Sequence, residues 1–200
     1  MLRTRLLASL VALVVLVGGA GCSQSPKVAA VVNDQVITMA ALQTSAGFLL
    51  ESEDMRGLLD WALNWGAIAK SDPTGVTLSL LITSALINQS LDKLDSPLTP
   101  ESRAQLWGTL TGQTNADWTS LRDDRRAAAI VDALLDQYLV SGLFEQEVVD
   151  RDVFFALFYI MPVEVNPRYG VWDAQSMTVS TRVDGLSAGP LADRTSFTMP

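Results

Sequence analysis

One serine and one lysine of the chain stand at a spacing that can support nucleophilic catalysis. Ser90 and Lys93 lie one helical turn apart, so a desolvated, neutral lysine amine could accept the proton of the serine hydroxyl. The Ser-Asp-Asn and Lys-Thr-Gly motifs that accompany such a pair in serine hydrolases of this kind are missing from the sequence. We therefore interpret Ser-x-x-Lys as a chance match at the polar end of a helix and predict no enzymatic activity.

Carboxylates are the other group of side chains with chemical potential, and they occur at Asp123–Asp124, Glu145–Glu147 and Asp150–Asp152. Residues two positions apart on a helix do not face each other, and arginines neighbour these acids, so we expect solvated surface charges. The chain has no histidine and one cysteine, which excludes histidine-based triads, internal disulfides and Cys/His zinc sites. The sequence therefore predicts no metal site and no cofactor.

The overall composition limits the class of protein further. The chain has 200 residues and a formal net charge of −8, which argues against nucleic acid as a partner, since phosphate binding needs a basic surface. Its apolar fraction of 48% is typical of a globular protein and too high for a disordered one. We expect one domain with a hydrophobic core.

The first 21 residues have the parts of an export signal. Arg3 and Arg5 provide positive charge, Leu6–Val17 is an uncharged apolar run, and small residues lead to Cys22. The apolar run is shorter than the roughly 20 residues that a membrane-spanning helix needs. We predict a signal peptide over residues 1–21; the alternative is an uncleaved N-terminal anchor helix.

Gly19-Ala20-Gly21-Cys22 resembles the lipobox of bacterial lipoproteins. The resemblance implies that the signal is cut before Cys22 and that the Cys22 thiol is lipidated, with a further acyl chain such as palmitate. Each buried CH₂ contributes about 0.8 kcal/mol, so two or three acyl chains would hold the protein on a membrane. We therefore predict a lipid anchor on the extracytoplasmic face of the cell membrane and a polar tether over residues 22–27.

Hydrophobic spacing predicts a helical domain between short terminal strands. Val28–Val32 and Gln35–Ile37 are expected to form a β-hairpin around Asn33-Asp34, because both turn residues tolerate a positive φ, and Thr38 is placed to cap the next helix. Helices are predicted over Met39–Leu50, Asp54–Lys70, Val76–Leu94, Glu101–Leu110, Asp124–Ser141 and Glu145–Tyr159. A further helical segment is expected after a cap at Thr114 or Asn115, and Gly142 is expected to stop the helix that begins at Asp124. Extended segments are predicted at Val163–Val165, Val171–Trp172 and Met177–Val179.

Two motifs at the ends of this domain resemble a family of extracytoplasmic chaperones. VAAVVNDQVITMAAL at Val28–Leu42 is similar to the opening of the SurA-like N-terminal chaperone domain, which PrsA also has. VEVNPRYGVWD at Val163–Asp173 resembles the end of SurA-like lipoproteins of high-GC Gram-positive bacteria. The resemblance implies a helical cradle closed by a small terminal sheet, which binds unfolded or partly folded exported polypeptides. No parvulin domain accompanies it, so prolyl isomerisation by that route is not expected.

Large aromatic side chains are the candidate client-binding residues, because they offer wide, adaptable apolar contacts. The alternative for each is packing in the core. Trp61 and Trp65, four positions apart, are expected on one helix face. The candidates are Trp61, Trp65, Trp107, Trp118, Phe154, Phe155, Phe158 and Tyr159.

The segment Asn166–Tyr169 allows two interpretations. Arg168 could pair with a client carboxylate or an internal acid, or the segment could be a structural turn in which Asn166-Pro167 bends the chain and Tyr169 and Trp172 pin the terminal strand. We favour the structural turn.

Together these observations predict a mainly α-helical bundle with a small sheet formed by the N-terminal hairpin and C-terminal strands, over residues 28–183, followed by a flexible tail over 184–200. The predicted function is a non-catalytic, membrane-anchored, chaperone-like protein. The alternative is an accessory or structural envelope lipoprotein that binds one specific protein partner.

Overall fold

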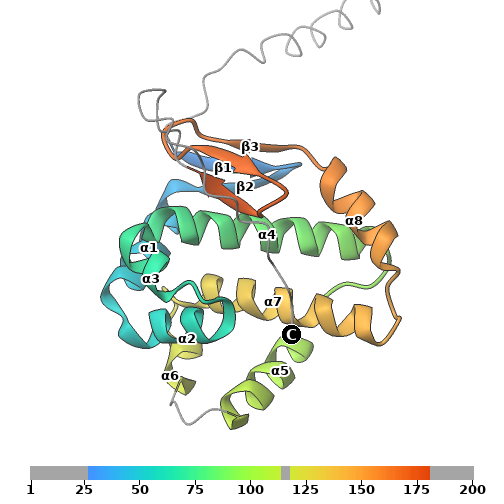
Figure 1. The fold of residues 1–200 in the computed structure, drawn as a ribbon, viewed down its shortest axis with the longest axis horizontal. Coiled ribbons are helices and arrows are strands. Elements are labelled where there is room, and N and C mark those ends of the chain that lie inside the picture. Colours follow the sequence, from blue (N-terminus) through green and yellow to red (C-terminus); the bar gives the residue numbers. More distant parts are fainter. Residues whose placement is uncertain (1–26, 114–117, 181–200) are drawn as a thin grey trace, which may run out of the picture.

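A computed structural model describes residues 27–113 and 118–180 of the chain. In these ranges the helix α4 (Pro73–Lys93) crosses the middle of the molecule, with a small sheet on one side and the helix α7 (Ala128–Glu145) on the other (Figure 1). The predicted fold class, mainly α-helical with a small sheet of terminal strands, is confirmed. The predicted signal, the lipidation site Cys22 and the tail over 184–200 lie outside the described residues.

The N-terminal hairpin forms as its turn residues predict. β1 (Val28–Val32) pairs antiparallel with β2 (Gln35–Thr38), and Asn33 adopts a positive φ of 54° in the turn. β3 (Val163–Val165) pairs antiparallel with the other edge of β1, which gives the strand order β2-β1-β3. The two ends of the domain therefore meet in one sheet.

The last two strands do not join this sheet. β4 (Val171–Asp173) and β5 (Thr178–Ser180) form a separate two-stranded hairpin, so of the extended segments predicted after the last helix only Val163–Val165 joins the terminal sheet. Hydrogen bonding to α4 fixes this hairpin instead: the Val179 N–H donates to Ser79 Oγ at 2.8 Å. The buried Ser79 hydroxyl in turn donates to the Gly75 carbonyl, so both of its hydrogen-bonding roles are used.

Capping side chains set the starts of the first helices. Thr38 accepts a hydrogen bond from the Ala41 N–H at the start of α1 (Met39–Glu51), as predicted. Ser52 and Asp72 cap α2 (Glu53–Leu63) and α4 in the same way. Pro73 at the first turn of α4 suits its fixed φ.

The single helix predicted over Asp54–Lys70 is wrong, because the chain breaks it into α2 and α3 (Gly66–Ser71). Asn64 ends α2 in the left-handed conformation with φ 55°, which asparagine tolerates. Gly66 follows because the chain passes close to Asp60: a Cβ at this position would lie 2.7 Å from the Asp60 Cβ. The Asp60 carboxylate accepts a hydrogen bond from the Gly66 N–H.

The later helices are α5 (Pro100–Gln113), α6 (Thr119–Asp123), α7 and α8 (Arg151–Ile160). α7 continues through Gly142 to Glu145, so the predicted stop at Gly142 is wrong. Asp150 caps α8 by accepting hydrogen bonds from two N–H groups, which is why the last helix begins six residues later than the predicted Glu145. The predicted caps Thr114 and Asn115 lie outside the described residues.

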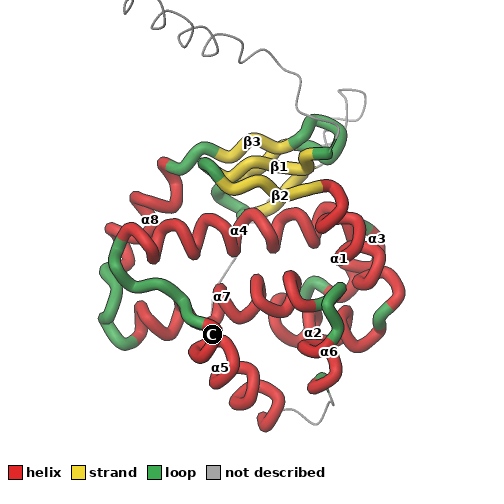
Figure 2. The backbone as a smooth tube through the Cα atoms, turned by 180° about the vertical axis from the view of Figure 1, so that it is seen from behind, coloured by secondary structure: helices red, strands yellow, loops and turns green. Residues whose placement is uncertain are grey.

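α4 is buried on nearly all sides and divides the core into two clusters. Leu78, Ile82 and Leu86 face the cluster under the sheet and α8, whereas Val76 and Leu80 face the cluster formed with α2, α5, α6 and α7. Figure 2 shows this arrangement from behind, with the strands on one side of α4 and most helices on the other. In the described ranges α4 is also the one helix long and apolar enough to span a membrane, but 72% of its apolar stretch is buried inside the protein, as in a core helix.

A buried polar network joins three helices across this core. The Asp136 carboxylate on α7 is 1% exposed and accepts hydrogen bonds from Ser84 Oγ (2.6 Å), Asn88 Nδ2 (2.7 Å) and Arg103 Nε (2.6 Å). Arg103 also donates to Asn88 Oδ1 at 2.9 Å. The network therefore fixes α5, which carries Arg103, against α4 and α7.

Candidate functional site: an apolar cleft at β3 and the outer face of α8

The serine and lysine of the Ser-x-x-Lys pair do not come together. Ser90 is fully buried, and its Oγ has no hydrogen-bond partner among the described residues. Lys93, one turn further along α4, is exposed. The lysine amine therefore cannot take the serine proton in this arrangement. In the described ranges there is also no group of three Asp, Glu, Cys or His side chains that could hold a metal ion.

Of the candidate tryptophans, two are core residues. Trp107 and Trp118 are each 7% exposed and pack in the cluster around α7. Trp61 is 46% exposed, yet its ring stacks on Tyr138 and lies 5.6 Å from the Trp118 ring. Trp65 follows the end of α2, so the prediction that Trp61 and Trp65 share one helix face is wrong.

The aromatic residues of α8 divide between core and surface. Phe154 and Phe158 are 1% and 2% exposed and fill the cluster under the sheet, while Phe155 is half-buried. Tyr159 is 50% exposed and stacks on Phe155, with ring centroids 5.8 Å apart. The core therefore takes two of these four rings and leaves Tyr159 at the surface.

The surface of α8 that points away from the core is apolar as well. Val153, Ala156 and Ile160 follow one another at helical spacing, and all three are exposed, Ile160 by 71%. With Tyr159 they form what we call the apolar face of α8. After Asp152 the helix has no polar side chain except the Tyr159 hydroxyl, and an amphipathic surface helix would place polar residues here. Isolated exposed apolar residues are ordinary, but a contiguous set marks an interaction surface.

The segment Asn166–Tyr169 forms the structural turn that the sequence favoured. Asn166 Nδ2 donates to the Val28 carbonyl at 2.9 Å, and its backbone N–H donates to the Ala29 carbonyl. Asn166 Oδ1 accepts from the Arg168 N–H, which closes the turn locally. One asparagine therefore ties the C-terminal strand to the first residues of β1.

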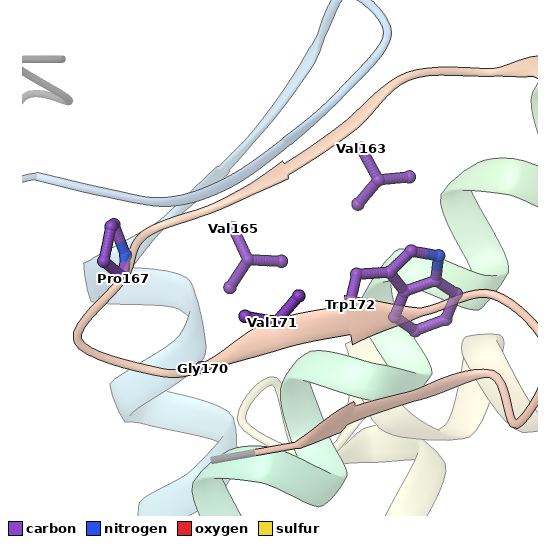
Figure 3. Close-up of a pocket in the computed structure, with 6 residues that line it drawn as sticks. All are labelled: Val163, Val165, Pro167, Gly170, Val171 and Trp172. Atoms are coloured by element: carbon purple, nitrogen blue, oxygen red, sulfur yellow. The ribbon is translucent and has the colours of Figure 1, made fainter. Parts of the chain in front are cut away.

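An apolar cleft opens where this turn leads from β3 to β4. It has a volume of about 210 Å³ and is lined by Val163, Val165, Pro167, Gly170, Val171 and Trp172, which we call the β3 cleft (Figure 3). Val163 and Val165 face Val171 and Trp172 across it, and Pro167 and Gly170 close it at the turn. Gly170 is buried and has a φ of 119°, a conformation that other residues rarely adopt.

The backbone of β3 has a free edge at this cleft. The Pro162 carbonyl accepts a hydrogen bond from the Asn33 N–H, just after β1, and the Asn166 N–H donates to the Ala29 carbonyl of β1. The backbone groups of β3 between these two bonds therefore point alternately toward β1 and away from it. Those of Val163 and Val165 point away from β1, and no hydrogen bond to them occurs among the described residues. An edge with unpaired N–H and C=O groups is a template for another strand.

Arg168 follows Pro167 at the turn that closes one end of the cleft. Arg168 is exposed, and its guanidinium lies 5.6 Å from the centroid of the Tyr169 ring and 3.6 Å from Met39 Sδ. It forms no ion pair with a carboxylate in the part of the chain that the structure describes. Within the described ranges, the internal acid that the sequence allowed as a partner of Arg168 is therefore not found.

The sequence identified the motif that builds the cleft but not the cleft. Val163, Val165, Gly170 and Val171 were noted as strand and turn residues, and the alternation of Val163-Glu164-Val165 was the signal that two valines share one face. The buried network of Asp136 was missed too, although an acid among the apolar residues of a helix was its signal.

Comparison of the chain with models of known protein families, with curated proteins and with solved structures found no match. The apolar face of α8 and the β3 cleft are therefore the features of the molecule that bear on its function.

Proposed function

We propose that the protein is a non-catalytic, chaperone-like holder of unfolded or partly folded exported polypeptides, anchored by lipid at Cys22 to the extracytoplasmic face of the membrane. The observation that carries the proposal is the apolar face of α8, where Val153, Tyr159 and Ile160 are 46%, 50% and 71% exposed on one short helix. Exposed apolar side chains in a row have no favourable partner in water, whereas an unfolded chain offers apolar side chains to cover them.

The position of this surface adds support. Ile160 ends α8, and the chain enters β3 three residues later at Val163, which lines the β3 cleft. Two apolar surfaces therefore follow each other along the chain. A non-specific holder benefits from such a surface, because contacts without directional hydrogen bonds accept many side-chain sequences. The net charge of −8 helps to keep a protein with this much apolar surface soluble.

The proposal is tested by suppression of aggregation. The full chain, incorporated in lipid nanodiscs, is mixed with a chemically unfolded reporter protein, and light scattering is followed during dilution. We expect scattering to fall as the chain approaches stoichiometric excess, and the double variant Tyr159→Ser/Ile160→Ser to lose most of this effect. Ile68→Ser is the matched control, because Ile68 is 48% exposed on α3, away from α8.

Two results would count against the proposal. The first is a wild-type chain that leaves scattering unchanged at excess. The second is equal suppression by the double variant and by Ile68→Ser, which would show that the apolar face of α8 does not hold the reporter. Isolation of one stoichiometric envelope protein with the chain would favour the accessory lipoprotein instead.

A further inference from the structure

We infer that the β3 cleft binds an extended segment of a polypeptide as an added β-strand, with alternate apolar side chains in the cleft and an acidic residue at Arg168. The inference rests on the proposed function and specifies how the polypeptide is held. It concerns a surface distinct from the outer face of α8, so the two can fail separately.

The backbone of β3 indicates that the ligand is a peptide. Val163 and Val165 direct two N–H and two C=O groups away from β1, at the sheet edge beside the cleft, and none has a hydrogen-bond partner among the described residues. A lipid chain would leave these groups unsatisfied, whereas an extended peptide supplies acceptors and donors at the same repeat. Strand addition would extend the sheet order from β2-β1-β3 to a fourth strand.

The side chains of the cleft indicate which residues of the peptide enter it. Val163 and Val165 lie opposite Val32 and Ala30 of β1, both fully buried, so these four side chains share the core face of the sheet. Every second side chain of an added strand would point to the same face and enter the cleft beside Trp172. Apolar, preferably β-branched side chains fit this lining, because its one polar side-chain group is the indole N–H of Trp172.

Charge complementarity selects the flanking residues of the peptide. Arg168 stands exposed at the turn end of the cleft and forms no ion pair in the described part of the chain, so a carboxylate in the peptide would complement it. Glu164 is exposed on the outer face of β3, where a basic residue of the added strand would lie opposite it. The structure thus favours an alternating apolar segment with an acid at one end.

The test uses a fluorescein-labelled peptide of alternating valine and threonine with glutamate at one end, titrated with the full chain in nanodiscs and followed by fluorescence anisotropy. N-methyl groups are placed on either of the two alternating sets of backbone nitrogens. We expect one set to weaken binding by about tenfold or more, since it removes hydrogen bonds to β3, and the other to change it by less than about twofold. Equal effects of both sets would overturn strand addition.

Two substitutions locate the site. Val171→Asp should weaken binding by about tenfold, because a charge would enter the apolar lining. Val36→Asp is the matched control, as Val36 is 51% and Val171 47% exposed, both on strands. Arg168→Glu should reverse the preference of the protein from the peptide ending in glutamate to one ending in lysine. Unchanged preference, or equal losses in the two valine variants, would refute the site.

Other occupants of the cleft give different results. If a second copy of the chain covers the edge, the wild-type protein will sediment as a dimer that Val171→Asp dissociates. If the chain's own end covers it, deletion of residues 184–200 will strengthen peptide binding by about tenfold or more. Either result would overturn the inference while leaving aggregation suppression by α8 intact, whereas loss of suppression with normal peptide binding would overturn only the proposed function.

Discussion

The Arg103–Asp136 pair gives the strongest prediction about stability. Arg103→Met keeps most of the apolar stem of the side chain and removes the guanidinium. Asp136, which is 1% exposed, then retains hydrogen bonds only from Ser84 and Asn88, both neutral donors. Removing one partner of a buried ion pair costs about 3–5 kcal/mol, because an uncompensated charge is left in the interior. With two hydrogen bonds remaining, we expect a loss of about 3 kcal/mol in the free energy of unfolding.

The matched control is Arg126→Met. Arg126 also bridges carboxylates, Glu51 at 3.2 Å and Asp124 at 2.9 Å, but its side chain is 50% exposed. Solvent-exposed ion pairs contribute little to stability, so this variant should unfold close to the wild type. The two variants make the same chemical change and differ in burial.

The measurement is urea-induced unfolding of residues 23–200 of both variants and the wild type, followed by circular dichroism at 222 nm. A loss of about 3 kcal/mol would be a large part of the 5–15 kcal/mol that holds an ordinary domain folded. If Arg103→Met and Arg126→Met shift the midpoint equally, with the slope unchanged, the buried network does not fasten α5 as we describe.

Three further predictions concern the turn at the cleft and the acid beside the network. Asn166→Ala should destabilise the domain by about 1–2 kcal/mol, because it removes the bond to the Val28 carbonyl, and amide exchange in β1 should accelerate; unchanged exchange would contradict the tie between the chain ends. Gly170→Ala should cost about 1–3 kcal/mol in thermal unfolding, since a φ of 119° strains any side chain; a wild-type melting temperature would refute this. Desolvation by the neighbouring helices raises the pKa of Asp132 above its ordinary value of 3.8, although the side chain is partly exposed, so the folded state disfavours its charged form. The free energy of unfolding should therefore fall as the pH rises through that raised pKa. Asp132→Asn should stabilise the protein at pH 7 but not below about pH 3.5, which the midpoints of urea unfolding at the two pH values will show.

Local features of the fold could be predicted because their causes lie within a few residues. The hairpin depends on Asn33, a turn residue that tolerates a positive φ, and the cap depends on the Thr38 side chain, which bonds to the backbone three residues later. The same local reasoning failed at Gly142, because α7 continues for one more turn, in which Leu143 and Phe144 pack against the core under the sheet. The left-handed residue that follows the helix is Glu147, with a φ of 55°.

By itself, the sequence determined the helical class of the domain, its terminal strands and the turn around Asn166, because periodicity and turn chemistry are written in neighbouring residues. Only the tertiary structure decided which aromatic rings are buried, that Phe154 packs inside while Tyr159 faces solvent, and that β3 keeps one edge free beside an apolar cleft. These outcomes depend on contacts between segments far apart in the chain, such as Asn166 with Val28, 138 residues away. Burial of a side chain and pairing of a strand are decided when distant segments pack together, so they cannot be predicted from a short stretch of sequence.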